Sequence, residues 1–426
     1  MRAKVMISAT AVAAMLTLVA GCGADSTDNE GEDGKVTLTV ATFNEFGYDD
    51  LLDEYMDLNP DVIVKEKKAA TSDEARENFM TKLAAGSGLS DIEGVEVDWL
   101  PEIMESSDLL TDLTSDEVEG RWLDWKAAQA TTGDGALIGY GTDIGPEGVC
   151  YRSDLFKKAG LPTDREEVAA AMGSTWDDYF AMGKEFTGKT GTPWFDSADA
   201  IFQGMVNQQA NPFSSTEPEE TLIPLDENTE IKAIYDTIIQ ASTTDDLSAN
   251  LQQWSTDWQQ AFQNDGFATM LCPGWMLGVI EGNAEGVEGW DIANTFPGGG
   301  GNWGGSFLTV PAQGDNVEEA QKLAAWLTAP EQQIKAFKAK GTFPSQVEGL
   351  TSPDLLGVTN AFFNDAPTGE ILAERAKAVT VVPFKGPSYF AYRQAVTDAI
   401  NRVDVDESAT PDESWEQAIS DVAALM

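Results

Sequence analysis

Histidine is absent from this chain of 426 residues. Hydrolases of the Ser-His-Asp type and thiol enzymes of the Cys-His type use an imidazole to take the proton of the nucleophile. Many zinc sites also depend on imidazole ligands. The sequence therefore excludes these nucleophilic mechanisms and histidine-dependent zinc centres, and we expect neither a metal site nor a cofactor.

Cysteine is scarce as well, with three in the whole chain. Cys150 and Cys272 each lie in a strand-like run, at 148–151 and 267–272. Two lone cysteines in an oxidising compartment are often paired. The residues alone leave two possibilities open, a disulfide between neighbouring strands or two buried free thiols.

Basic residues are few. The chain has 26 Lys and Arg against 72 Asp and Glu, a formal net charge of −46. Such a field repels nucleic acids, phosphorylated substrates and anionic lipid head groups, but it does not penalise an uncharged ligand. We therefore expect no nucleic-acid partner, although colloidal stability alone would also explain the charge.

Only one long apolar run is present, and it lies at the N-terminus. After residue 22 no stretch approaches the roughly 18–20 apolar residues that span a bilayer. Residues 5–20 are apolar apart from small hydroxylated side chains, and Arg2 and Lys4 precede them, which is the layout of a signal peptide. We predict a signal peptide over residues 1–21.

The first 22 residues end in Leu18-Val-Ala-Gly-Cys22, which resembles the bacterial lipoprotein signal. In that signal, cleavage leaves the cysteine as a lipid-bearing N-terminus. We therefore expect lipidation of Cys22, a flexible acidic tether over residues 22–35, and a protein anchored at the extracellular face of the cytoplasmic membrane. The alternative is an ordinary signal peptide with a cysteine there by chance.

The rest of the chain alternates strand and helix patterns. About 390 residues is long for one core, so we expect two domains. Period-two and helical patterns predict an α/β fold with a mainly parallel sheet. The predicted strands include 35–43, 61–65, 92–97, 136–140 and 267–271, and the predicted helices include 49–58, 229–241, 246–264, 317–328, 331–339, 388–402 and 412–424.

Two segments resemble ligand motifs only superficially. The glycine-rich segment 298–305 lacks the Gly-Lys-Ser/Thr of a phosphate-binding loop. The acidic segment 404–408 lacks the central Gly and final Glu of a calcium loop, so it is better interpreted as a solvated helix end. Carboxylates are so abundant that any pair of them says little about glycosidase chemistry.

Tryptophan carries more information. Aromatic rings stack on the apolar faces of sugars, and nearby polar side chains hydrogen-bond the hydroxyl rim. Some of the 12 Trp residues follow apparent strands or lie in loops, namely Trp99, Trp194, Trp275 and Trp303. Core packing explains any one of them about equally well, but Pro273-Gly274 before Trp275 favours a ligand contact there. Others fall in predicted helices and are assigned to packing: Trp122, Trp125, Trp254, Trp258 and Trp326.

Several segments together resemble a known family. Residues 141–162, 266–276 and 320–336 are similar to the crossover segment, the Gly-Trp turn and the late helix pair of family 1 extracellular solute-binding proteins of ABC sugar importers. The similarity runs from about residue 36 to the C-terminus. The first two segments, with 86–92, are similar in particular to actinobacterial cellobiose- and cello-oligosaccharide-binding lipoproteins.

The resemblance implies a two-lobed periplasmic-binding-protein type II fold, like that of maltose-binding protein, with the ligand cleft between the lobes. It implies crossings near 140–143, 302–305 and 345–349. The N-lobe would comprise 36–142 and 305–346, and the C-lobe 143–304 and 347–426. Cys150 and Cys272 would lie on neighbouring strands of the C-lobe, which favours a disulfide.

The resemblance also implies ligand contacts from loops that follow strands in both lobes. Asp196 is a weaker candidate. The expected ligand-binding residues are Phe43, Asn44, Phe46, Glu96, Asp98, Trp99, Asp143, Trp275, Trp303, Tyr389 and Arg393.

These features together predict a monomeric extracellular receptor, not an enzyme, that delivers a sugar to the transmembrane subunits of an ABC permease. The favoured ligand is a β-linked oligosaccharide such as cellobiose or a cello-oligosaccharide. The alternatives are a xylo-, manno- or malto-oligosaccharide, a secreted glycosidase, and a peptide- or polyamine-binding protein on the same scaffold.

Overall fold

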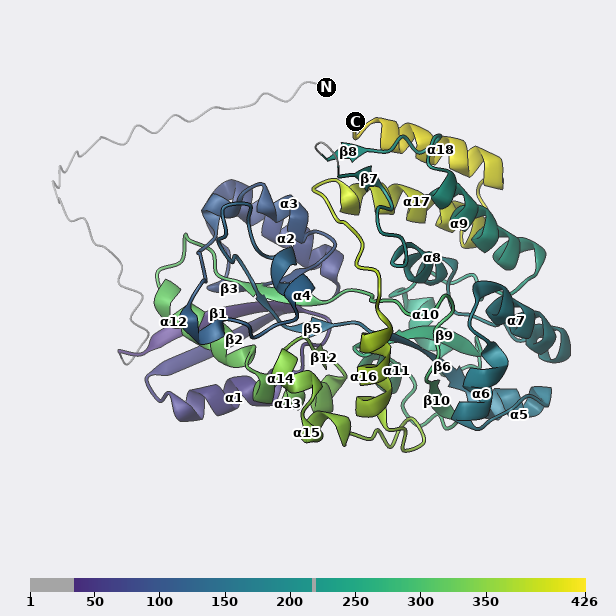
Figure 1. Ribbon diagram of the computed structural model, residues 1–426, viewed down its shortest axis with the longest axis horizontal. Coiled ribbons are helices and arrows are strands. Elements are labelled where there is room, and N and C mark those ends of the chain that lie inside the picture. The colour runs from purple at the N-terminus through teal and green to yellow at the C-terminus, as the bar shows by residue number, and fades with distance from the viewer. Residues whose placement is uncertain (1–33, 217–219) are drawn as a thin grey trace, which may run out of the picture.

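The computed structural model describes residues 34–216 and 220–426. The expected signal peptide, Cys22 and all but the last two residues of the expected tether lie outside the described residues. The described chain forms two α/β lobes that lie side by side (Figure 1). None of the helices in this part of the chain combines the length and apolar character that crossing a bilayer requires.

The first lobe is built on a five-stranded sheet in the order β2-β1-β3-β11-β4. The first three strands in this order are parallel, and β11 runs antiparallel to both of its neighbours. In β1 the alternating pattern buries Leu38 and Val40, as the sequence predicts. The strands are β1 (Val36–Phe43), β2 (Val62–Ala69), β3 (Ile92–Glu96), β4 (Tyr140–Gly141) and β11 (Ser306–Thr309).

Helices of the first lobe follow its strands in the chain and share its core. Because the parallel strands are joined by helices, their carboxyl ends meet at one edge of the sheet, where ligand sites of such folds form. The helices are α1 (Asp49–Leu58), α2 (Ser72–Ala85), α3 (Leu100–Met104), α4 (Asp124–Gln129) and α12 (Val317–Leu327), with short 3-10 turns at Ser107–Leu109 and Asp116–Val118.

The second lobe contains a three-stranded antiparallel sheet in the order β10-β6-β9. A larger set of helices surrounds it (Figure 1). The strands are β6 (Glu147–Arg152), β9 (Thr269–Pro273) and β10 (Trp290–Ala293), with a small hairpin of β7 (Ser214–Ser215) and β8 (Thr221–Leu222). The helices are α5 (Ser153–Ala159), α6 (Arg165–Met172), α7 (Trp176–Thr190), α8 (Ala198–Val206), α9 (Thr229–Ile239), α10 (Thr256–Ala261), α11 (Met276–Asn283), α16 (Thr368–Ala378), α17 (Tyr389–Asp404) and α18 (Pro411–Ala423), with a π-helical turn at Gln240–Thr244.

Short segments carry the chain between the lobes. Between β4 and β6 lies β5 (Asp143–Ile144), which pairs with β12 (Phe343–Pro344). The helix before β12, α13 (Pro330–Lys340), contributes Ala336 to the first-lobe core and Ile334 and Phe337 to a cluster of the second lobe. This helix therefore packs on both lobes, and it is followed by α14 (Val347–Leu350) and α15 (Pro353–Leu356).

Cys150 and Cys272 lie on neighbouring antiparallel strands, β6 and β9. The structure joins their sulfur atoms in a disulfide bond, with the Cα atoms 5.4 Å apart. Both residues are fully buried in a cluster with Trp258 and Trp290. The bond thus crosslinks the centre of the second-lobe sheet.

Two sequence-based assignments in the second lobe differ from the structure. The predicted helix 246–264 is helical only over α10, because Ser255 caps that helix by accepting a hydrogen bond from the amide of Trp258. Asp404, expected at a solvated helix end, is buried and accepts hydrogen bonds from Ser242, Ser248 and Asn250. The cap is a local contact, whereas tertiary contacts with Phe195 and Asp404 hold residues 248–250 of the preceding segment.

The interior of the second lobe holds several carboxyl groups. Burial raises the pKa of Glu147 well above its ordinary value and also raises the pKa of Asp404, although hydrogen bonds oppose the shift at Asp404. Burial raises the pKa of Asp196 to about 7, against hydrogen bonds from Gln253 and Trp258. The folded protein therefore holds protons on acids that an unfolded chain would release near neutral pH.

This arrangement predicts that stability falls as the pH rises from about 5 to 7. The folded pKa of Asp196, about 7, lies above its ordinary value of 3.8. The stability that this group contributes is thus fully present at low pH and is lost as the pH approaches its folded pKa. For this group alone the loss is roughly 2 kcal/mol, measurable from urea unfolding curves across that range.

Asp196→Asn should flatten the pH dependence, whereas the exposed Asp57→Asn should leave it unchanged. A free energy of unfolding that is constant or rises between pH 5 and 7 would contradict the prediction.

Candidate functional site

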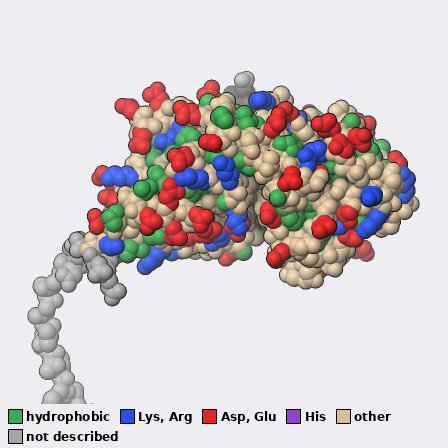
Figure 2. All heavy atoms as spheres, turned by 90° about the horizontal axis from the view of Figure 1, so that it is seen from below, with side chains coloured by type: hydrophobic (Ala, Val, Ile, Leu, Met, Phe, Trp, Pro, Cys, Tyr) green, Lys and Arg blue, Asp and Glu red, His purple; other side chains and the backbone are tan. Residues whose placement is uncertain are grey.

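A cavity of about 450 Å³ lies between the two lobes. Acidic side chains are spread over both lobes, and the surface is hollowed between them (Figure 2). The first lobe contributes the carboxyl ends of β1 and β3 and the start of α2. The second lobe contributes residues 252–255, the turn after β9, the segment before β11 and one face of α17.

Three tryptophans from the second lobe and the crossing segment form one wall of the cavity: Trp254, Trp275 and Trp303. The rings of Trp254 and Trp275 are stacked, with centroids 6.1 Å apart and planes at 24°. Trp303 meets Trp275 nearly at a right angle, at 5.4 Å. The indole N–H of Trp275 donates to the backbone carbonyl of Trp303 at 2.9 Å. The three rings therefore form a bent, largely apolar surface, which we call the aromatic wall.

A glycine of the crossing segment holds this wall in place. A Cβ on Gly145 would lie 1.8 Å from the carbonyl oxygen of Trp303 and 3.0 Å from Nε1 of Trp275. The Gly145 amide donates to Asn302, and its carbonyl accepts from the Trp303 amide at 2.8 Å. Only a residue without a side chain permits this approach.

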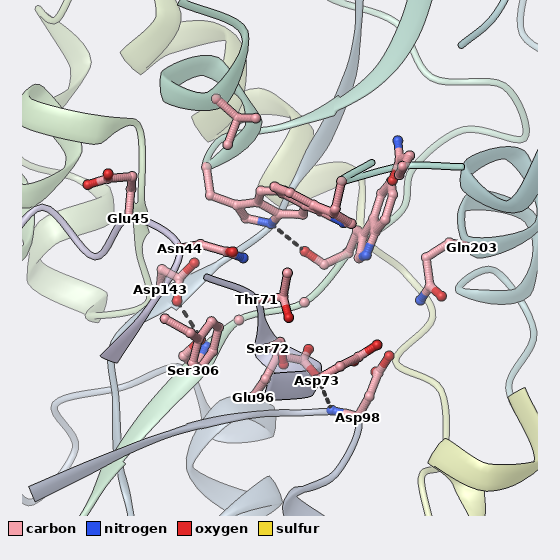
Figure 3. Close-up of a pocket in the computed structure, with 18 of the residues that line it drawn as sticks. Asn44, Glu45, Thr71, Ser72, Asp73, Glu96, Asp98, Asp143, Gln203 and Ser306 are labelled. Atoms are coloured by element: carbon pink, nitrogen blue, oxygen red, sulfur yellow. Dashed lines mark hydrogen bonds between the residues drawn. The ribbon is translucent and has the colours of Figure 1, made fainter. Parts of the chain in front are cut away.

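The first lobe provides a polar wall opposite (Figure 3). Asn44 ends β1 in the left-handed region, with φ of 48°, and its buried Oδ1 has no hydrogen-bond partner within the protein. Thr71 caps α2 by accepting a hydrogen bond from the amide of Glu74, and this brings Ser72 and Asp73 to the cavity. Amide and hydroxyl groups are thus presented at the ends of β1 and β2.

Two carboxyl groups from the end of β3 and the turn after it, those of Glu96 and Asp98, lie at the base of the polar wall (Figure 3). Asp98 forms ion pairs with Lys385 and with Arg393, whose Nε lies 3.4 Å away. Burial alone would raise the pKa of Asp98, but the charges of Lys385 and Arg393 outweigh it and lower the pKa. Asp98 is therefore a carboxylate that joins the first lobe to two cations of the second.

The pKa of Glu96 shifts in the opposite direction to that of Asp98. Burial, together with the negative charge of Asp98, raises the pKa of Glu96 to about 8. Glu96 Oε2 accepts a hydrogen bond from the Asp98 amide at 2.8 Å. The raised pKa favours the protonated form of Glu96, which can donate a hydrogen bond into the cavity as well as accept one.

Asp143 lies where the chain leaves the first lobe. Its Oδ1 accepts hydrogen bonds from the Thr142 hydroxyl and the Ser306 amide, at 2.8 and 2.9 Å. Behind it Lys126 is buried, with Nζ 3.7 Å from the centroid of the Phe307 ring. Burial lowers the pKa of Lys126 to about 7, against the charges of Asp143 and Glu96.

The structure brings most of the sequence-predicted site residues to this cavity. Those that line it are Phe43, Asn44, Phe46, Glu96, Asp98, Asp143, Trp275, Trp303 and Arg393. They come from both lobes and from the crossing segments between them.

Trp99 and Tyr389, two of the expected ligand-binding residues, do not line the cavity in the structure. Trp99 is fully buried in the first-lobe core, 5.8 Å from the Phe79 ring, and donates to Ser72 Oγ. The chain turns after β3, so that Asp98 points to the cavity and Trp99 points away. Tyr389 packs on Phe213 in the second-lobe core. Asp196, the weaker candidate, is also buried and is not a lining residue.

Sequence reasoning missed several lining residues. Trp254 was assigned to a helix, but it precedes α10 and has a φ of 69°. Ser255, a favoured N-cap residue followed by an acidic first turn, was the signal that Trp254 lies outside the helix. On α17 the predicted Arg393 faces the cavity together with residues that the sequence reasoning missed: Phe390, Gln394, Thr397 and Asn401.

The described residues contain no group of three or more His, Cys, Asp or Glu side chains that could hold a metal ion. What the cavity offers is an apolar aromatic wall, a hydrogen-bonding wall, and a floor of carboxyl groups. This combination is suited to binding a ligand with both apolar faces and hydroxyl groups.

Comparisons with known proteins identify the family. A family model described as bacterial extracellular solute-binding protein matches residues 50–355. The arabinooligosaccharide-binding protein of Bacillus subtilis (strain 168) is 26% identical over 360 residues, which are 80% of this chain and 80% of that protein.

Solved structures agree with this result. A crystal structure of an extracellular solute-binding protein of family 1 is 49% identical, with a TM-score of 0.79, and the match covers 91% of this chain and 99% of that one. The ABC transporter-associated binding protein of B. animalis subsp. lactis Bl-04, in complex with β-1,6-galactobiose, has the same fold, with a TM-score of 0.79 at 20% identity over 92% of this chain and 97% of that one. The fold is thus the predicted two-lobed fold, and the chain belongs to the bacterial extracellular solute-binding proteins of family 1.

Proposed function

We propose that this protein is the extracellular receptor of an ABC importer for an uncharged oligosaccharide, with a β-linked glucan such as cellobiose or a cello-oligosaccharide as the favoured ligand. The observation that carries the proposal is the aromatic wall facing the polar wall across one cavity. As a member of a solute-binding family the protein is a receptor and not an enzyme.

The chemistry of the two walls matches the two surfaces of a sugar. Pyranose rings with equatorial substituents present flat C–H faces that pack on indole rings. Their hydroxyl groups need donors and acceptors, which Asn44, Thr71 and Glu96 supply from the first lobe. The cavity of about 450 Å³ lies within the range of small-ligand sites.

The relatives support a sugar as the ligand, but they do not indicate a particular sugar or linkage. One is named for arabinooligosaccharides and one for lactose, and a structural neighbour holds β-1,6-galactobiose. The preference for a β-1,4-glucan rests instead on the resemblance of 141–162, 266–276 and 86–92 to cello-oligosaccharide-binding lipoproteins.

Binding would proceed by closure of the lobes. A sugar that stacks on the aromatic wall would be covered by the polar wall as the crossing segments bend, which excludes water from the cavity. The ligand would shift the open–closed equilibrium only by its greater affinity for the closed form. The closed receptor would then dock on the permease. A lipid on Cys22 and a tether over 22–35 would keep it nearby at high local concentration.

The charge of the cavity restricts the ligand. Among the described residues that line it, Arg393 is the one basic side chain, and it is already paired with Asp98. Lys385 is also paired with Asp98, and Lys126 lies behind the wall. A carboxylate on the sugar would find carboxyl groups and no unpaired cation, so we infer that the ligand is uncharged.

The first test is a thermal-shift screen against cello-, xylo-, manno-, malto- and arabino-oligosaccharides, followed by calorimetric titration. We expect the largest stabilisation from a cello-oligosaccharide, because binding only to the folded state raises the melting temperature. A larger shift with another series would overturn the β-glucan assignment. No shift with any sugar would overturn the sugar-receptor proposal.

Trp275→Ala should weaken binding of the best sugar by more than ~1 kcal/mol, which is more than roughly fivefold in Kd, because the stacking face is lost. The measurement is calorimetric titration of the folded variant. Trp326→Ala is the matched control, since Trp326 packs on Tyr55 in the first lobe, away from the cavity. Unchanged affinity of Trp275→Ala would remove this ring from the binding surface.

An acidic analogue of the same sugar should bind at least about tenfold more weakly, since its charge would be buried without a partner beside carboxylates. Cellobiose and cellobiouronic acid form a matched pair that differs only in the oxidised carbon. The difference in affinity between the two sugars should become smaller in high salt, because part of it comes from long-range repulsion that salt screens. Equal affinity for the two compounds would show that an unpaired cation is available in the cavity.

A further inference from the structure

Trp254 is presented by a segment without regular secondary structure, between the π-helical turn that ends at Thr244 and α10. The first half of this segment is held by its backbone. The amides of Trp194 and Phe195 donate to the carbonyl of Leu247, at 2.8 and 3.1 Å, and the amide of Ala249 donates to the carbonyl of Phe195 at 2.9 Å. Among the described residues, no comparable set of backbone hydrogen bonds joins 251–255 to 194–196, so the position of Trp254 needs another cause.

A buried carboxyl group, that of Asp196, lies beneath the second half of the segment. Oδ2 of Asp196 accepts a hydrogen bond from the side-chain amide of Gln253 and another from the indole N–H of Trp258, each at 2.8 Å. Asp196 is fully buried. Its two donors flank Trp254 in the sequence, one just before it and one in the first turn of α10.

The conformation of Trp254 requires such support. Its φ of 69° is in the left-handed region, which is unfavourable for a large side chain and persists only where the surroundings impose it. Its ring lies between Trp258, at 5.4 Å, and Trp275, at 6.1 Å. The hydrogen bond from Trp258 to Asp196 therefore fixes one of the two rings against which Trp254 packs.

We propose that Asp196 is a positioning residue of the ligand site, which holds Trp254 in the aromatic wall through Gln253 and Trp258 without itself touching the ligand. Asp196 does not line the cavity, whereas Gln253 and Trp254 do. Loss of this acceptor would leave two buried donors unpaired. The proposal rests on the proposed function, because it assigns Trp254 to ligand binding.

The most conservative test removes one of the two hydrogen bonds to Asp196 and keeps an aromatic ring at position 258. Trp258→Phe loses the indole N–H that Asp196 accepts. Trp290→Phe is the matched control, because Trp290 is buried in the same cluster and its Nε1 has no hydrogen-bond partner. By hydrogen exchange of the ligand-free protein, we expect faster exchange over 250–256 in Trp258→Phe than in Trp290→Phe. Equal exchange in the two variants would overturn the anchoring role.

A double-mutant cycle tests whether Asp196 acts through Trp254. Asp196→Ala should weaken binding of the best sugar by roughly tenfold in the native background, but by less than about twofold in the Trp254→Ala background. Asp196→Asn keeps an oxygen that can accept both hydrogen bonds, so its Kd should stay within about twofold of the native value. A purely structural role of Asp196 would weaken binding equally in both backgrounds, and that result would overturn the proposal.

Two outcomes separate this inference from the proposed function. If no oligosaccharide binds the native protein, the proposed function fails, while the exchange comparison still decides whether Asp196 anchors 250–256. If sugars bind but Trp254→Ala leaves the Kd unchanged, the receptor role stands and the positioning role of Asp196 is overturned.

Discussion

The ion pairs of Asp98 with Lys385 and Arg393 connect the polar wall of one lobe to the helical face of the other. All three side chains are largely buried. A charge in such a place is tolerated only when it is paired and hydrogen-bonded. Because Asp98 uses both cations, neither is available to a ligand. These two ion pairs therefore link the lobes and also remove Lys385 and Arg393 as free partners for a charged ligand.

The two walls of the cavity are built by different means. The polar wall comes from residues at the carboxyl ends of β1, β2 and β3. These ends lie at the same edge of the sheet because the three strands are parallel. The aromatic wall comes from segments far apart in the chain, around residues 254, 275 and 303. Gly145 and Asn302 of the crossing segments pack against this wall. Bending of those segments during closure would thus act directly on the ring positions.

The sequence predicted the polar wall better than the aromatic one. Asn44, Glu96 and Asp98 each follow a strand with a clear alternating or apolar pattern, and such positions lie at the cleft in any fold of this class. Trp99 and Tyr389, expected at the cleft by the same reasoning, do not line the cavity in the structure. Proximity along the chain did not determine which way each side chain points, and the neighbours of these two rings lie in the lobe cores.

For Trp254 the difference runs the other way, because the sequence assigns it to helix packing and the structure places it at the cavity. Its surroundings in the sequence are helix-like, and the irregular conformation of 246–255 depends on partners at 194–196 and at Asp404. Local propensity has no access to such contacts, because they form only when the second lobe is assembled. The capping residue Ser255 was the local sign that the helix begins later.

The sequence by itself determined the α/β class, the family resemblance, the exclusion of histidine chemistry, and several of the residues that line the cleft, because these follow from periodicity, composition and motifs that are local in the chain. Only the tertiary structure decided which tryptophans face the cavity, which carboxyl groups are buried, and which cations are already paired. The physical reason is that side-chain direction, desolvation and charge pairing depend on neighbours supplied by distant segments, and the pattern along one segment does not contain them.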